Sequence, residues 1–408
     1  MKEDRNFLYS EEFYGDLLNQ VFFAEKPLGI RQYQNARILP TRSGLADEGG
    51  LVSKEGAFID GTGLHRGLGG KYPFEEEEVF CSRETVIFIG MLCPIWGHCI
   101  TDNLRRLWFL FSEEYKEKYA SCKIVYLPMK GFSFSGSFAE LLSVMGIPYE
   151  RFRPVTRIPQ FKTVIVPDEC FFVGEGRKRF FTKEYRELID RVRAYAESHA
   201  RPTGCEKLYF TYSHYKKGKQ VGEEKLEAFF KEKGYRVIAP ERYSFKEQLN
   251  LLWNCREFAS TIGSCSHNVI FLQEGTRVTL IPRAYYLTEY QAALDQVYPL
   301  KLSFADASAS LFVDRRNPWT GPWYFFVTPE LLRCFEDGRK TDQAFWNRQL
   351  NDFKKYRRIG LRNIEGKDIV APEFYLKKSW EYLSHIYGAG TLVKTLKKLK
   401  RKLSHGDR

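Results

Sequence analysis

The sequence contains no apolar run long enough to cross a bilayer. Its most apolar segment, residues 85–96, ends at Gly97 and His98, whereas a membrane helix needs about 20 apolar residues. The first 20 residues are dense in charge and lack the continuous apolar stretch of a signal peptide. These absences predict a cytoplasmic protein.

Paired cysteines are missing as well. The nine cysteines are an odd number, and no two stand in a C-x-x-C pair. This argues against a disulfide framework and against a zinc module, so we expect buried, apolar-like cysteines. Cys265 is the cysteine most favoured for a functional role, because it lies inside a small-residue motif described below.

What is present suffices for two hydrophobic cores. Of the 408 residues, 43% are apolar and 16% aromatic, so we do not expect a disordered chain. The net charge is +12, but half of that excess lies between residues 391 and 403, which hold six basic residues and no acid. Elsewhere the charges are mixed, so we expect no nucleic-acid partner.

Strand and helix patterns alternate along most of the chain. Expected strands are residues 85–89, 123–127, 163–167, 208–211, 236–238, 258–262 and 277–281. Expected helices are residues 96–111, 137–145, 183–199, 222–233, 245–254 and 267–274. Residues 49–70 are rich in glycine and are expected to be irregular. This order predicts an α/β protein with parallel strands and right-handed crossovers.

A polar group follows the first expected strand. His98, Asp102 and Arg106 are spaced four residues apart, which would place them on one face of a helix. A carboxylate between an imidazole and a guanidinium could act as a general base, and we favour Asp102 for that role. The alternative is an ordinary ion pair and a capping histidine on a solvated helix.

The same residues resemble the signature of glycosyltransferase family 61, H-[WY]-x-x-[DE]-x-[LM]-P-[RK]-[LM]. His98, Asp102, Leu104, Arg106 and Leu107 fall on its defining positions. The chain departs from it twice, since cysteine stands at 99 where an aromatic residue is usual and arginine stands at 105 in place of proline. Neither departure removes a titratable group.

Residues 208–283 also resemble the family, in particular its bacterial members linked to capsular or other surface polysaccharides. This resemblance rests on the order of short segments: Y-F-T-Y at 209–212, G-E-E at 222–224, P-E at 240–241, S-F-K-E-Q at 244–248 and I-G-S-C-S-H-N at 262–268. The resemblance implies a nucleotide-sugar donor on this part of the chain.

The last of these segments is a small-residue turn after an expected strand. Free backbone N–H groups, serine hydroxyls and a glycine favour a phosphate, and His267 could add a hydrogen bond or a positive charge. The expected donor-binding residues here are Gly263, Ser264, Cys265, Ser266, His267 and Asn268. The alternative is a simple helix cap followed by a structural histidine.

Further donor contacts are expected from Glu241, Gln248 and Tyr212, and Tyr290 with Gln291 would line the acceptor side. Tyr212 occupies the place of an arginine that the resemblance would aim at the donor phosphates. Lys216 could replace it, as could its neighbours at 217 and 219, although these lysines also fit a solvated loop. Without a replacement, the chain could be a non-catalytic glycan- or nucleotide-binding protein.

The resemblance implies a GT-B-like fold, with two Rossmann-type domains facing across a cleft. The expected units are residues 1–200 on the acceptor side, 201–300 on the donor side, and an aromatic-rich extension at 301–408. The chain has no D-x-D triad, which points to a metal-independent reaction and no cofactor beyond a UDP- or GDP-sugar. The resemblance also implies inversion of the transferred sugar.

The expected acceptor is a cell-surface polysaccharide or a lipid-linked glycan. Residues 391–403 show leucines at helical spacing opposite most of the six cations, a pattern typical of helices that lie on anionic membranes. Peripheral attachment to the inner face of the cytoplasmic membrane is therefore expected. A solvated terminal helix is the alternative.

Overall fold

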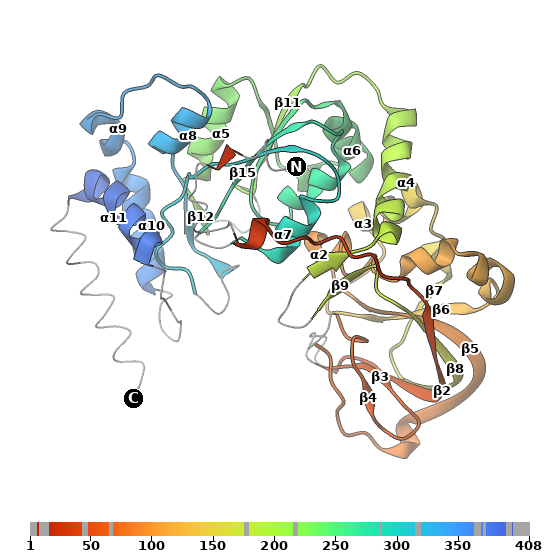
Figure 1. Cartoon of the computed structure of the whole chain (residues 1–408). Helices are drawn as coiled ribbons and strands as arrows, with labels where there is room; N and C mark the ends of the chain where they lie inside the picture. The colour runs from red at the N-terminus through yellow and green to blue at the C-terminus, as the bar shows by residue number, and fades with distance from the viewer. Residues whose placement is uncertain are drawn as a thin grey trace.

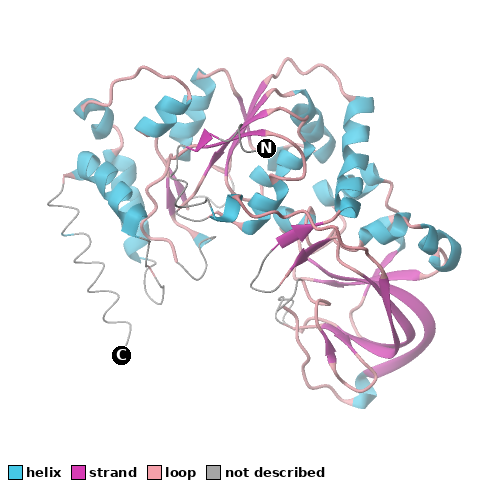
Figure 2. Ribbon diagram, in the orientation of Figure 1, coloured by secondary structure: helices cyan, strands magenta, loops and turns pink. Residues whose placement is uncertain are grey.

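The structure is a computed structural model of the chain (Figure 1). It describes residues 6–7, 16–42, 48–64, 68–174, 179–214, 219–284, 287–314, 320–362, 369, 373–388 and 394. Two large β-sheets form the frame of the molecule, and helices lie over them and between them (Figure 2). The protein is therefore of the mixed α/β class.

The first sheet has seven strands and is mixed. Its order is β4 (Phe58–Ile59), β3 (Gly50–Val52), β2 (Ile30–Leu39), β8 (Ile158–Pro167), β5 (Val79–Leu92), β6 (Lys123–Pro128) and β7 (Phe152–Pro154). Strand β2 runs antiparallel to β3 and β8, while β5 runs parallel to β6 and β8. An all-parallel Rossmann sheet is thus not what this half contains.

The second sheet is parallel throughout its six strands. Its order is β1 (Asn6–Phe7), β16 (Lys301–Phe304), β15 (Arg277–Ile281), β14 (Glu257–Thr261), β11 (Lys207–Phe210) and β13 (Arg236–Ile238). Every pairing in it is parallel. The carboxyl ends of these strands therefore meet at one edge, where α/β proteins build their ligand sites.

In the second half, capping hydrogen bonds define the start of helix α6. Helices α5 (Glu223–Glu232) and α6 (Phe245–Asn254) connect its strands. At the start of α6, the Ser244 hydroxyl accepts the Glu247 N–H at 3.3 Å, and the Glu247 carboxylate accepts the Ser244 N–H at 2.8 Å. This reciprocal cap satisfies two donors that a helix end leaves open.

The aromatic-rich carboxyl-terminal part packs on the second sheet. Strand β17 (Trp323–Tyr324) pairs with β12 (Gln220–Val221), and the helices that follow are α8 (Pro329–Cys334), α9 (Gln343–Asn347), α10 (Leu350–Arg362) and α11 (Glu373–Tyr387). Tyr324, Phe326 and Trp346 share one buried cluster with Tyr209 and Phe230 of the sheet domain. The extension thus covers the second sheet.

The largest apolar cluster runs through both halves. It joins Ile87 and Ile165 of the first sheet to Leu208 and Phe258 of the second, with Tyr185 of helix α4 (Lys183–His199) among them. In Figure 1, α4 lies beside α6, on the side of the upper half. One continuous core therefore spans the predicted boundary at residue 200.

Several elements match the sequence prediction closely, and the segment after β5 differs most from it. Helix α4, helix α6 and strands β13 and β15 have the predicted bounds. The single helix predicted at 96–111 is wrong: the chain forms the short helix α2 (Trp96–Cys99), then turns, then the 3-10 helix η2 (Leu107–Phe111). The Asn103 side chain bonds the backbone N–H and C=O of Cys93 at 2.9 and 3.0 Å, and this local pairing competes with helix formation.

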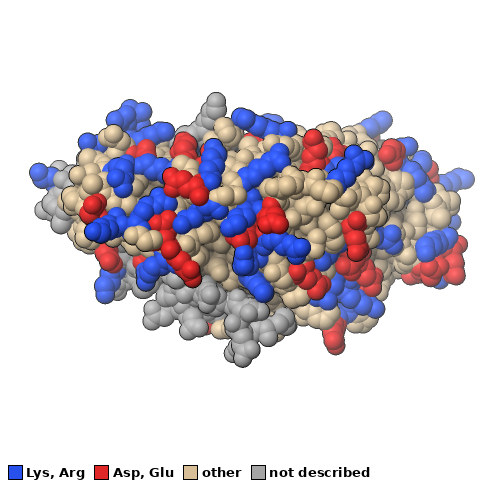
Figure 3. Space-filling view, turned by 90° about the horizontal axis from the view of Figure 1, so that it is seen from above, with Lys and Arg blue, Asp and Glu red and all other residues tan. Residues whose placement is uncertain are grey.

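The distribution of surface charge and the apolar character of the helices bear on the predicted partners. On the face seen in Figure 3, acidic and basic side chains are interspersed. Within the described ranges, no helix combines the length and the apolar character that a bilayer crossing needs. The basic segment at 391–403 lies outside the described residues except for Lys394, so its membrane role stays a prediction.

Candidate active site

The site is built where strand β5 ends. Helix α2 begins at Trp96, four residues beyond the strand, and the turns that follow bring Asp102 back to His98. His98 Nδ1 lies 2.6 Å from Asp102 Oδ2. The predicted spacing of four residues thus does produce a contact, although in a short helix and turn.

Burial divides this pair unequally. The Asp102 side chain is 2% exposed, whereas that of His98 is 27% exposed. The hydroxyl of Tyr290, in helix α7 (Glu289–Leu294), donates to Asp102 and lies 2.9 Å from Oδ2 and 3.1 Å from Oδ1. Asp102 is therefore enclosed, and His98 is the member of the pair that a substrate can reach.

Arg106 does not join this face, contrary to the sequence prediction. It is fully buried, its Nη2 donates to the Gly61 carbonyl at 2.8 Å, and its Nη1 lies 3.5 Å from Glu169. Burial and the neighbouring Arg105 lower its pKa to about 9. The broken helix rotates residue 106 away from His98, so Arg106 holds the glycine-rich segment instead.

The second part of the site is the turn between β14 and the 3-10 helix η7 (Ser266–Phe271). The Gly263 N–H donates to the Ser266 hydroxyl at 2.9 Å, and the Asn268 amide donates to the Cys265 carbonyl at 2.8 Å. The predicted helix at 267–274 is thus a shorter 3-10 turn. Side chains within the turn hold its shape.

The two parts touch directly. Trp96 Nε1 donates to Asn268 Oδ1 at 3.1 Å. A Cβ atom on Gly97 would lie 3.0 Å from His267 Nδ1 and 3.2 Å from Ser264 Oγ, so glycine lets the backbone of α2 approach the turn. The structure therefore brings two separate sequence motifs, the segment of His98 and Asp102 and the turn at 263–268, next to each other.

His267 is neutral at physiological pH. It is 8% exposed, and burial, together with the nearby His98 and Arg283, lowers its pKa to about 3. The positive charge considered for this residue is thus excluded near neutral pH, which leaves hydrogen bonding. Its ring stacks on that of Tyr290, with 6.3 Å between centroids.

Tyr212 closes the far side of the turn. Its hydroxyl accepts the Cys265 N–H at 2.6 Å, and burial raises the pKa of both this phenol and the Cys265 thiol. The Arg283 guanidinium lies over the Tyr212 ring at 4.1 Å. At the position where the resemblance implies an arginine, the chain therefore has a tyrosine with an arginine stacked on it.

With this geometry in view, the comparisons with known proteins can be stated. Residues 96–279 match the model of a family described as Glycosyltransferase 61. The match supports glycosyltransferase family 61. The matched segment begins at Trp96 and ends within β15, so it includes both His98 and the turn at 263–268.

Other comparisons add little to the family 61 match. The sequence has no match among curated proteins. A crystal structure of the bacterial iron-containing dodecameric glycosyltransferase TibC from enterotoxigenic E. coli H10407 aligns over 93% of each chain, at 12% identity and a TM-score of 0.23. A TM-score this low carries no argument about fold or function.

The remaining donor contacts expected from family 61 fall in different places. Glu241 is exposed in the 3-10 helix η6 (Pro240–Arg242), and its negative charge contributes to the raised pKa of the Cys265 thiol. Gln248 is buried and donates to the carbonyls of Pro240 and Tyr243 at 2.9 and 3.0 Å, which makes it a support for that turn. Lys216 lies outside the described residues.

Two arginines at the site were missed from the sequence. Arg179, in β10 (Arg179–Phe181), lies 4.0 Å over the Tyr290 ring, and Arg283 follows β15 beside Gly263. Nothing local distinguishes Arg179. Arg283 could have been predicted, because it follows the strand expected at 277–281 and the turn at 263–268 follows the strand expected at 258–262. The carboxyl ends of neighbouring parallel strands lie at one edge of a sheet.

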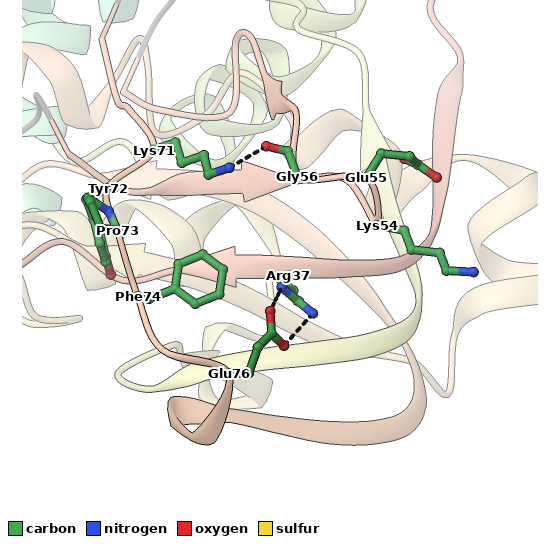
Figure 4. Close-up of a pocket in the computed structure, with 9 residues that line it drawn as sticks. All are labelled: Arg37, Lys54, Glu55, Gly56, Lys71, Tyr72, Pro73, Phe74 and Glu76. Atoms are coloured by element: carbon green, nitrogen blue, oxygen red, sulfur yellow. Dashed lines mark hydrogen bonds and ion pairs between the residues drawn. The ribbon is translucent and has the colours of Figure 1, made fainter.

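An open cavity of about 750 Å³ lies elsewhere, around β2 and β3 of the first sheet (Figure 4). Its lining residues are Arg37, Lys54, Glu55, Gly56, Lys71, Tyr72, Pro73, Phe74 and Glu76. None of these belongs to the family 61 motifs. Arg37 and Glu76 form an ion pair in its wall at 2.8 Å. Among the described residues, no group of three or more His, Cys, Asp or Glu is arranged to hold a metal ion.

Proposed function

We propose that the protein is an inverting glycosyltransferase that moves a sugar from a UDP- or GDP-sugar to a hydroxyl of a glycan or lipid-linked acceptor. The observation that carries this proposal is the contact of helix α2, which carries His98 and its partner Asp102, with the turn at 263–268. A base and a phosphate-binding turn side by side are what a single displacement at the anomeric carbon needs.

In the proposed reaction His98, rather than Asp102, is the base. Because the Asp102 carboxylate only accepts, the His98 nitrogen facing it, Nδ1, carries the proton, and Nε2 is left to accept one. His98 Nε2 would take the proton of the acceptor hydroxyl while the oxygen of that hydroxyl bonds to the anomeric carbon. The bond from that carbon to the diphosphate breaks, and the electron pair leaves with the nucleoside diphosphate.

Asp102 and Tyr290 are positioning residues in this scheme. Asp102 fixes the tautomer and orientation of His98 and stabilises the imidazolium that forms. The Tyr290 hydroxyl holds the carboxylate through both of its oxygens. This arrangement explains why a buried acid contributes to a reaction that it does not touch.

The leaving diphosphate would lie at the turn. Gly263 and Ser264 are partly exposed there, and the neutral His267 can donate a hydrogen bond. The absence of a D-x-D triad from the sequence favours charge stabilisation by protein groups. A GT-B-like arrangement of the two halves, with a mixed sheet in place of a Rossmann-type sheet in the first half, belongs to the same proposal. So do the surface-polysaccharide acceptor and peripheral attachment to the cytoplasmic face of the membrane.

The test measures transfer and binding separately. Wild type, His98→Ala and Asp102→Asn are each incubated with UDP-, GDP-, CMP- and dTDP-sugars, with and without simple glycosides, and the released nucleotide is quantified. We expect release by wild type with one of these donors. Both variants should lose at least about 100-fold in turnover, the usual contribution of a general base, with nucleotide affinity within about threefold.

His199→Ala is the matched control, since His199 is exposed at the end of α4 and lies outside the site. Its turnover should equal that of wild type. Nucleotide binding without turnover, unchanged in Asp102→Asn, would favour a non-catalytic binding protein. Full activity of His98→Ala would remove the assigned base.

A further inference from the structure

Arg283 has an unusual environment for an arginine. It follows β15 by two residues and is 8% exposed. Its Nε and Nη2 are buried and have no hydrogen-bond partner, and among the described residues it forms no ion pair. Burying a charged group without partners is costly, so such a group signals a missing ligand.

Neighbouring aromatic rings fix this side chain in place. The guanidinium lies 4.1 Å from the centre of the Tyr212 ring and 4.8 Å from that of Trp323. The Arg283 carbonyl accepts the Ser310 hydroxyl at 2.6 Å. Stacking holds the plane of the guanidinium and leaves the N–H groups of Nε and Nη2 unused, so its orientation is set before any ligand arrives.

The guanidinium faces the turn at 263–268. A Cβ atom on Gly263 would lie 2.6 Å from Arg283 Nη2 and 2.8 Å from its Cζ. Gly263 also has φ of 154°, a conformation that residues other than glycine rarely adopt. Glycine is required here because the guanidinium presses against the backbone of the turn.

The charge of Arg283 is only partly balanced. Glu223 is fully buried, and burial raises its pKa to about 7, although the Tyr212 N–H and the charge of Arg283 both lower it. Glu223 Oε1 is engaged by the Tyr212 N–H at 2.9 Å. Near neutral pH this acid is therefore partly protonated, and a net positive charge remains beside the turn.

We infer that Arg283 binds the diphosphate of the nucleotide-sugar donor. This inference rests on the proposed function. A planar guanidinium with two unused donor nitrogens, Nε and Nη2, suits two oxygens of a diphosphate, and the uncompensated charge suits its anionic character. Arg283 thus supplies, from the end of β15, the cation that position 212 lacks, while Tyr212 serves as the surface on which it stacks.

The experiment compares a nucleoside diphosphate with its own nucleoside. Affinities of UDP, uridine, GDP and guanosine are measured by calorimetry for wild type, Arg283→Gln and Arg283→Lys, and thermal unfolding of each unliganded protein shows that it is folded. For the preferred base, Arg283→Gln should lose roughly 10- to 100-fold in diphosphate affinity. Its nucleoside affinity should stay within about twofold, and Arg283→Lys should fall between wild type and Arg283→Gln.

Two further variants separate binding from folding. Arg277→Gln is the matched control, because Arg277 lies on the same strand with a 68% exposed side chain, and it should bind as wild type does. Gly263→Ala keeps Arg283 but pushes its guanidinium away, and it should lower diphosphate affinity in the same direction. If Arg283→Gln does not fold, Arg283→Lys provides the test, because it leaves the turn itself unchanged.

The outcomes are distinct. An unchanged ratio of diphosphate to nucleoside affinity in folded Arg283→Gln, with lowered thermal stability, would assign Arg283 a structural role and overturn this inference alone. Failure of wild type to bind any nucleoside diphosphate, including CDP and dTDP, would overturn the proposed function and this inference with it.

Discussion

At the scale of single residues, burial decides which group of a pair performs chemistry. The spacing of His98 and Asp102 predicts their contact, and the structure contains it. Spacing carries no information about depth, however, and the acid is enclosed while the histidine is partly exposed. In the proposed reaction the base is therefore His98 in place of Asp102, and the same two residues remain at the centre of the candidate site.

His267 leads to a prediction about pH. In the unfolded chain its pKa is close to 6.5, and in the folded protein it is about 3, so below pH 6.5 the unfolded chain binds a proton that the folded one excludes. The free energy of unfolding should fall as pH falls. Between pH 7 and 5 this contribution is about 2 kcal/mol.

The measurement is urea unfolding of wild type and His267→Gln at the two pH values. Glu223, with its raised pKa, contributes with the opposite sign, so the difference between the two proteins isolates His267. His199→Gln, at an exposed position, is the control and should follow wild type. Parallel pH dependence of wild type and His267→Gln would contradict the neutral, buried histidine.

At the scale of elements, the sequence predicted helices correctly where their ends and apolar faces are determined by nearby residues. Helix α6 has the predicted bounds because Ser244 and Glu247 cap it, and α4 because its apolar face recurs at helical spacing. The single helix predicted after β5 is wrong because the Asn103 side chain bonds the Cys93 backbone. The spacing of apolar residues in the sequence does not reveal such a contact. Strands β3 and β4 were missed because they are short and lie in a glycine-rich segment, where they pair with each other and β3 pairs with β2.

The close approach of α2 to the turn leads to a prediction for Gly97→Ala. The added methyl group would lie 3.0 Å from His267 Nδ1 and 3.2 Å from Ser264 Oγ, which forces the two parts of the site apart. A displacement of this kind should lower kcat by roughly 10- to 100-fold. Helix propensity itself favours alanine, so local helix stability should not fall.

Steady-state kinetics and thermal unfolding check this prediction. Gly338→Ala is the matched control, since a Cβ atom there meets nothing within 4 Å. It should retain the kcat of wild type. A Gly97→Ala enzyme with unchanged kcat would show that the contact between α2 and the turn is not needed for transfer.

At the scale of the whole molecule, the sequence indicates the α/β class and the parallel second sheet, but not the mixed first sheet. Antiparallel pairing of β2 with β8 joins segments more than 120 residues apart, and no local pattern reports it. The boundary predicted at residue 200 follows a change of pattern. The apolar cluster that contains Ile87, Tyr185 and Phe258 crosses it.

A fragment of residues 1–200 should therefore not fold as a stable unit. Without the second half, the side chains of α4 that pack against it would be exposed to water, at a cost of roughly 25 cal/mol for each Å² of apolar surface. Circular dichroism during heating should show a broad, non-cooperative change, in contrast to a sharp transition in the full chain. A sharp transition in the fragment would establish an independent domain.

This continuity also bears on how the protein can diverge. Recombination that replaced one half with that of a relative would have to preserve complementary packing along the whole seam, from residue 18 to residue 304. Substitutions in surface loops meet no such requirement. New specificities are thus accessible to this lineage by point mutation in loops far more readily than by exchange of halves.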